Sequence, residues 1–189
     1  MTNPAPDQLA QARAHWRWRG ADRPPFAEAP APGQTSVWDF PRPPELVHDA
    51  REIVVRWGAL EVARTRGAWA VRETAHPPTF YLPLSDVDRS LLRPAGGGSF
   101  CEWKGPARYW DLADGARRLA KVAWSYPQPL AGAEPLSDCI AFYAHDLAGV
   151  VHQVWRAREI PHRGLSWRRS FGKRWTVRAA PAPLGAGLG

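Results

Sequence analysis

Three side chains with acid, base and cation chemistry lie close together near the middle of the chain. Arg72, Glu73 and His76 fall within five positions, just before the double proline Pro77-Pro78. Proline fixes its own φ and restricts the residue before it, so the strand end expected here is stiff. A stiff strand end can hold side chains over a cavity, where Glu73 or His76 would move protons and Arg72 would hold an anionic group. The alternative is an Arg–Glu surface pair beside a turn histidine.

A second set of reactive groups lies in the segment Cys101–Lys104. Lys104 is one of three lysines in a chain with 25 basic residues, which favours a use for a compact ammonium that arginine cannot supply. The alternative is a solvated lysine at a turn. Strand alternation puts Cys101 and Lys104 on opposite faces unless a turn near Gly105 redirects Lys104. Cys101 would be either a packed thiol or a nucleophile. We predict that one cavity is surrounded by four catalytic candidates: Glu73, His76, Cys101 and Lys104.

Aromatic side chains follow the same segments and could wall an apolar pocket with a few polar groups. Rings at this spacing also suit a hydrophobic core, and that alternative stays open. The candidate ligand-binding residues are Arg72, Tyr81, Trp103, Tyr109, Trp124 and Tyr126.

The elements that would position these residues are mostly short strands, so we expect an all-β or β-rich fold of compact antiparallel sheets. Gly58-Ala59 predicts a two-residue hairpin turn. Ser85 begins a capping-box pattern, which predicts one short helix over 85–92, ended by Pro94 and a flexible loop at Gly96–Gly98. The predicted strands cover residues 53–57, 60–63, 68–72, 80–82, 99–103, 107–112, 119–124, 139–143 and 150–155.

Composition divides the chain into three parts. Residues 1–45 contain nine prolines and five large aromatics, which predicts an extended arm packed on the body, with room for a short helix over 7–19. Residues 46–155 form the β-rich body. Residues 156–189 carry eight basic side chains and only one acidic one, so the whole net charge of +7 lies in this tail, whose last part we expect to be disordered.

Several classes of protein are excluded by what the sequence lacks. No apolar run approaches a membrane span and no secretory signal is visible, so we expect a cytoplasmic protein. Two cysteines 38 positions apart do not make a zinc site or a disulfide framework. We therefore expect no metal and no cofactor, and the oligomeric state is left open.

The segments above resemble a bacterial family catalogued as domain of unknown function 427, sometimes labelled nucleotidyltransferase-like. The resemblance runs from about Ile53 to His145. It is carried by Arg72-Glu73, His76-Pro77-Pro78, Tyr81-Leu82-Pro83, Cys101–Gly105, Tyr109-Trp110, Ala123–Pro127 and Ala141–Tyr143.

The resemblance implies an antiparallel fold similar to the β-tent or Mss4-like architecture, without the paired cysteines that bind metal in such proteins. It implies no established reaction. The nucleotidyltransferase label would need a carboxylate pair such as Asp86 and Asp88, but their position at the expected helix start favours a capping role.

Three hypotheses about function follow. In the first, the protein binds a small molecule in an aromatic-lined pocket. The molecule is anionic in one version of this hypothesis, and whether the protein also catalyses a reaction stays open. The second is a nucleic-acid accessory protein that acts through residues 156–189. The third is a protein-interaction module without a site.

Overall fold

The computed structural model describes residues 4–143, in which nine antiparallel strands account for most of the regular structure. The strands are β1 (Glu45–Asp49), β2 (Ile53–Trp57), β3 (Leu60–Thr65), β4 (Ala68–Arg72), β5 (Thr79–Pro83), β6 (Leu92–Cys101), β7 (Gly105–Asp114), β8 (Arg117–Ser125) and β9 (Cys139–Phe142). The β-rich antiparallel fold expected from the sequence is confirmed.

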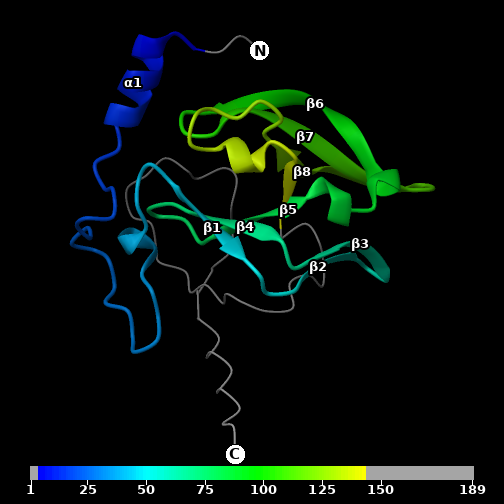
Figure 1. The fold of residues 1–189 in the computed structure, drawn as a ribbon, viewed down its shortest axis with the longest axis horizontal. Coiled ribbons are helices and arrows are strands. Elements are labelled where there is room, and N and C mark those ends of the chain that lie inside the picture. Colours follow the sequence, from blue (N-terminus) through cyan, green and yellow to red (C-terminus); the bar gives the residue numbers. More distant parts are fainter. Residues whose placement is uncertain (1–3, 144–189) are drawn as a thin grey trace, which may run out of the picture.

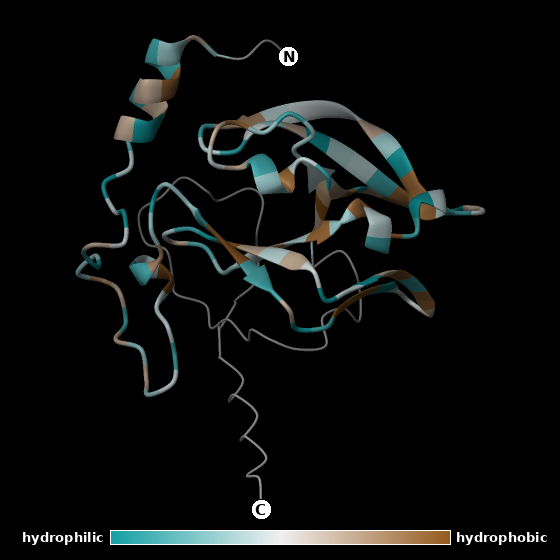
Figure 2. Cartoon of the chain, viewed as in Figure 1, coloured by the Kyte–Doolittle hydropathy of each residue, from teal (hydrophilic) through white to brown (hydrophobic). Residues whose placement is uncertain are grey.

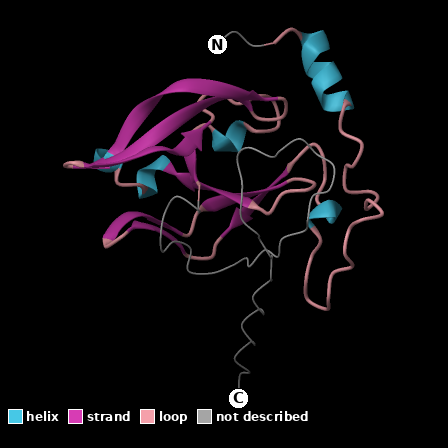
Figure 3. Ribbon diagram, turned by 180° about the vertical axis from the view of Figure 1, so that it is seen from behind, coloured by secondary structure: helices cyan, strands magenta, loops and turns pink. Residues whose placement is uncertain are grey.

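Seven of the strands form one sheet in the order β1-β4-β5-β9-β8-β7-β6, and β2 and β3 form a separate hairpin. Figures 1 and 3 show that the long β6–β7–β8 ribbon lies over β4 and β5, so the large sheet bends back on itself. The described strands close no barrel. One core cluster fills the space between the layers, with members such as Val55, Leu82, Leu112 and Ile140. Burial of these apolar side chains is the main force that holds the layers together.

The hairpin predicted at Gly58-Ala59 joins β2 to β3, and Gly58 has a φ of +60. A positive φ is what a primed two-residue turn requires of its first position. The strand expected over 150–155 lies outside the described residues.

The helix predicted over 85–92 is wrong. Two short 3-10 helices, Leu84–Asp86 and Arg89–Leu91, replace it. The segment between them is tied to β3, because Val87 bridges to Ala63 and the Asp88 amide donates to the Val62 carbonyl. Backbone groups that pair with a strand are not free to continue a helix.

The flexible loop predicted at Gly96–Gly98 is also wrong, since these glycines lie inside β6. The β6–β7 register shifts between Pro94 and Gly98, which marks a bulge. Glycine suits such a bulge because Gly97 has a φ of +81. Beyond the bulge, β6 pairs with β7 again from Gly98 to Cys101. This pairing holds the glycines in the strand, which their local sequence alone would not do.

The N-terminal arm, here residues 4–44, runs along one side of the sheets (Figure 1). Its helix α1 (Pro6–Ala14) is shorter than expected, buries none of its residues and mixes polar with apolar side chains (Figure 2). The arm is held farther along, where Trp38 and Phe40 are buried and the Ala75 amide donates to the Val37 carbonyl. No helix in residues 4–143 is long and apolar enough to cross a membrane.

Candidate functional site

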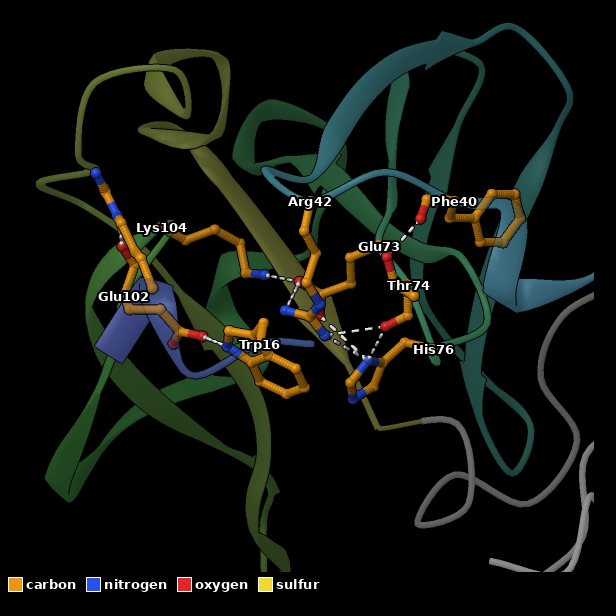
Figure 4. A network of polar contacts seen from close by, with 9 residues as sticks. Trp16, Phe40, Arg42, Glu73, Thr74, His76, Glu102 and Lys104 are labelled. Carbon is orange, nitrogen blue, oxygen red and sulfur yellow. Dashed lines mark hydrogen bonds and ion pairs between the residues drawn. The ribbon is translucent and has the colours of Figure 1, made fainter. Parts of the chain in front are cut away.

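A group of buried charged side chains lies where the arm meets the end of β4 and the β6–β7 loop (Figure 4). Lys104 Nζ lies 3.0 Å from Glu73 Oε2, and Arg42 Nη1 lies 3.8 Å from the same oxygen. The side chains of Lys104, Glu73 and Arg42 are 8%, 17% and 2% exposed. We call these three side chains, together with the half-exposed His76 beside them, the charge cluster.

Arg42 enters the charge cluster from the arm. Its Nη2 donates to the Thr74 carbonyl at 2.9 Å and lies 3.4 Å from His76 Nδ1. Its guanidinium carbon lies 3.6 Å from the centre of the Trp16 ring, a cation–π contact. Burial lowers the pKa of Arg42, while the charge of Glu73 opposes that change. Arginine stays protonated in proteins, so this buried side chain carries a full positive charge.

The surroundings keep Glu73 ionised and His76 neutral at pH 7. Burial alone would raise the pKa of Glu73, but the charges of Lys104 and Arg42, joined by that of His76 once it is protonated in acid, outweigh it and lower that pKa from its ordinary 4.5. Burial lowers the pKa of His76 from its ordinary 6.5, and Glu73 only partly offsets this. The charge cluster therefore holds two cationic side chains against one carboxylate.

Local backbone geometry explains how Lys104 reaches Glu73. Strand β6 stops at Cys101, which pairs with Gly105, so residues 102–104 form a three-residue hairpin loop rather than the strand end expected from the sequence. Gly105 has a φ of +100, and a Cβ there would lie 3.1 Å from the Gln128 carbonyl oxygen. A glycine is needed at that turn, and the turn carries Lys104 out of the strand alternation and toward the arm.

A small cavity of about 90 Å³ adjoins the charge cluster. Lys104 and Trp103 are the two predicted site residues that line it within the described part of the chain. The other lining residues are Arg13, Pro43, Pro44, Leu46 and residues 131–133. Trp103 is 8% exposed, and its indole Nε1–H has no hydrogen-bond acceptor among residues 4–143. An unpaired buried donor is uncommon in proteins, so this N–H needs an explanation.

The predicted aromatic residues pack mainly against one another. Tyr81 is buried at the centre of a second core cluster, accepts a hydrogen bond from Trp124 Nε1 at 3.0 Å and lies 6.1 Å from the Tyr126 ring. Trp124 also stacks on Tyr143 with ring centres 4.3 Å apart. Burial raises the pKa of Tyr81 and of Tyr126, so both phenols stay neutral. These rings are core, and none of them lines the Lys104 cavity.

Three further predicted residues also lie outside the charge cluster. Cys101 is a half-buried free thiol at the end of β6 and packs against the second core cluster. Arg72 pairs with Glu45 on the neighbouring strand at 3.7 Å. The Tyr109 hydroxyl donates to Ser99 Oγ across the β6–β7 hairpin.

Four residues that surround the site were not among the candidate site residues: Arg13, Trp16, Arg42 and Glu102. Trp16 Nε1 donates to Glu102 Oε1 at 2.6 Å, and Arg13 Nε donates to the Glu102 carbonyl at 2.8 Å. Arg13 also lies over the Trp103 ring at 5.0 Å. Arg42 stands between prolines in Pro41–Pro44. A single charged side chain in so rigid a segment is the sequence feature that could have marked Arg42 as a candidate.

The carboxylate pair that a nucleotidyltransferase would need has structural partners here. Asp86 accepts from Thr65 Oγ1 at 2.6 Å, and Asp88 caps a 3-10 helix by accepting from the Ser90 amide at 2.9 Å. Within residues 4–143, no three His, Cys, Asp or Glu side chains gather closely enough to hold a metal ion.

The fold and the site together define a small antiparallel β-domain, completed by an N-terminal arm, with a buried charge cluster beside a cavity. The model of the family described as domain of unknown function (DUF427) matches residues 45–153, so the chain belongs to that family, as the sequence resemblance indicated. A search of curated proteins found no match.

Proposed function

We propose that the protein binds a small anionic molecule in the Lys104 cavity. The observation that carries the proposal is the excess of positive charge: Arg42 and Lys104 are both buried, and Glu73 is the one carboxylate that contacts them among residues 4–143. A buried charge without a counter-charge is costly, and a bound anion beside Lys104 would supply one.

The next nearest charges do not remove this excess. Glu102 lies close enough to act on the pKa of Arg42, but the Arg13 side chain is hydrogen-bonded to the carbonyl of the same residue. Counting Glu102 and Arg13 with the charge cluster adds one negative and one positive charge, so the net charge stays at one positive charge. An ammonium has three N–H donors, so Lys104 can keep Glu73 and still donate to a ligand.

Binding is the proposal, and no reaction is attached to it. The catalytic roles of Glu73, His76, Cys101 and Lys104 stay predictions, as does the cytoplasmic location. Glu73 is ionised and held by cations, which suits positioning of Lys104 better than uptake of a proton at neutral pH.

The test is anion titration followed by thermal unfolding at low ionic strength. Lys104→Met removes the ammonium, and Lys104→Arg keeps a cation in case the first variant folds poorly. Lys121→Met is the matched control, because Lys121 lies over the Tyr109 ring on another part of the surface. A ligand present at about 100 times its dissociation constant stabilises the folded state by about 2.7 kcal/mol.

Wild type and Lys121→Met should be stabilised by small anions, and Lys104→Met should not. Equal stabilisation of Lys104→Met, or none of the wild type by any anion tested, would rule out the proposal.

A second candidate function rests on the charge of residues 156–189, which hold eight basic side chains and Glu159. Such a segment can bind polyanions by releasing their counterions. Its structure lies outside the described residues, so the support is compositional.

A further inference from the structure

The chemistry of the cavity walls restricts which anion fits, and this step rests on the proposed function. We infer that the ligand is a small monocarboxylate with an apolar body, bound with its carboxylate at Lys104 Nζ and Trp103 Nε1. Its body would lie against Pro43, Pro44 and Leu46.

The donors favour a carboxylate. Two residues that line the cavity carry N–H donors that are not fully used: Lys104, whose ammonium has donors beyond the one that Glu73 accepts, and Trp103, whose buried indole N–H has no acceptor among residues 4–143. A carboxylate has two oxygens and one negative charge, so it can accept from both groups and match the single excess charge of the cluster. A phosphate would bring more negative charge than the single excess positive charge of the cluster.

The backbone on the opposite wall argues against phosphate as well. Phosphate sites commonly use successive free backbone amides in a turn. Here the Gly132 amide donates to Glu134 Oε2 at 2.9 Å, and the Ala133 amide donates to the Leu130 carbonyl at 3.0 Å. These amides are already used within their own turn.

The remaining lining side chains favour an apolar body. Pro43, Pro44, Leu46, Ala131 and Ala133 have no side-chain polar atoms, so the hydroxyls of a sugar would lose their hydrogen bonds to water without replacement. Arg13 donates its Nε–H to the Glu102 carbonyl and lies over the Trp103 ring, and its remaining N–H groups add to the donors available to the carboxylate. The ligand body therefore needs little beyond apolar contact.

The size of the cavity sets the last limit. One water-sized group needs roughly 10–15 Å³, so a cavity of about 90 Å³ holds about six to nine non-hydrogen atoms. Benzoate falls within this range, acetate falls below it, and 4-phenylbenzoate exceeds it.

The experiment titrates the full chain with benzoate, benzamide, acetate, 4-phenylbenzoate and orthophosphate. The readout is the NMR signal of the Trp103 indole N–H, assigned by its loss in Trp103→Phe, together with calorimetric affinities. We expect benzoate to bind at least about tenfold more tightly than each of the other four compounds, and to move the Trp103 signal in the direction of a stronger hydrogen bond. Lys104→Met should lose at least about tenfold in benzoate affinity, and Lys121→Met should lose none.

The outcomes separate the two proposals. If acetate or orthophosphate binds as tightly as benzoate and depends on Lys104, the carboxylate inference is overturned while anion binding stands. If benzamide binds as tightly as benzoate, the argument from charge is overturned. If 4-phenylbenzoate binds as tightly as benzoate, the argument from size is overturned. If no anion binds, or if benzoate binds Lys104→Met as well as the wild type, both proposals fall.

Discussion

Replacing Glu73 by glutamine would remove the one negative charge of the cluster while keeping nearly the same shape. Arg42 and Lys104 would then remain buried with no carboxylate within 4 Å among the described residues. We expect Glu73→Gln to be among the most destabilising single polar substitutions in the protein, because each cation loses its counter-charge and stays largely out of water.

The magnitude follows from the two distances. At an effective dielectric constant of about 20, unit charges at 3.0 Å and 3.8 Å attract by about 5.5 and 4.4 kcal/mol. Desolvation of the three groups offsets much of this attraction in the folded wild type. Breaking a buried ion pair by removing one partner costs about 3–5 kcal/mol, and we expect Glu73→Gln to fall in that range.

The assay is equilibrium unfolding in urea at pH 7, with the m-value checked for a two-state transition. Glu61→Gln is the control, since Glu61 pairs with arginines on the exposed surface and should barely move the midpoint. The folded pKa of Glu73 lies below its ordinary 4.5, so the stability it provides is present above pH 4.5 and is lost as the pH falls through the folded value. The difference between wild type and Glu73→Gln should therefore shrink in acid.

A loss below about 1 kcal/mol at pH 7, or a difference that does not change with acidification, would refute the reasoning that Glu73 neutralises two buried cations. A bound anion should also restore part of the stability that Glu73→Gln loses. The variant site has two uncompensated cations, so benzoate should stabilise Glu73→Gln more than it stabilises the wild type, provided that anion binding itself holds.

Other predictions concern the arm, the histidine, a turn and the tail. Trp38→Ala should cost about 3–5 kcal/mol in urea unfolding, as loss of a buried large aromatic does, and a cost below about 0.5 kcal/mol would mean that the arm is not held there. The folded pKa of His76 is lowered, so stability should fall as the pH drops below 6.5, and His76→Gln should remove that slope between pH 7.5 and 5.5; an unchanged slope would assign it to another group. Gly105→Ala should lower the melting temperature and weaken benzoate binding, because its positive φ is strained for alanine; wild-type values for both would refute that account of the hairpin loop. Deleting residues 156–189 should abolish salt-dependent polyanion binding and leave a folded body, whereas equal binding by the shortened chain would place that affinity elsewhere.

Features fixed by local chemistry were predictable from the sequence. The Gly58-Ala59 turn carries its own signal in the glycine, and it lies between two short runs rich in apolar residues, at 53–57 and 60–63. The helix over 85–92 was mispredicted because its pattern is local, whereas the contact that prevents it, between Val87 and Ala63 on β3, is not.

The same distinction applies to the site. Glu73 and Lys104 were candidates because each stands out from its neighbours, and the turn at Gly105 was recognisable as a place where Lys104 could leave the strand alternation. Arg42 was missed, since nothing in its prolines indicates a contact with the Thr74 carbonyl 32 positions later. The aromatic rings were ambiguous from spacing alone, and Tyr81 lies buried in the second core cluster.

The path of the arm has a practical consequence for how this family is handled. The family match begins at residue 45, but Arg42 and two of the proline walls of the cavity precede it. A fragment cut at that boundary would keep Glu73 and Lys104 and lose the groups that enclose them. A comparison of relatives over the matched region alone therefore omits the segment that, in this chain, places Arg42 against Glu73.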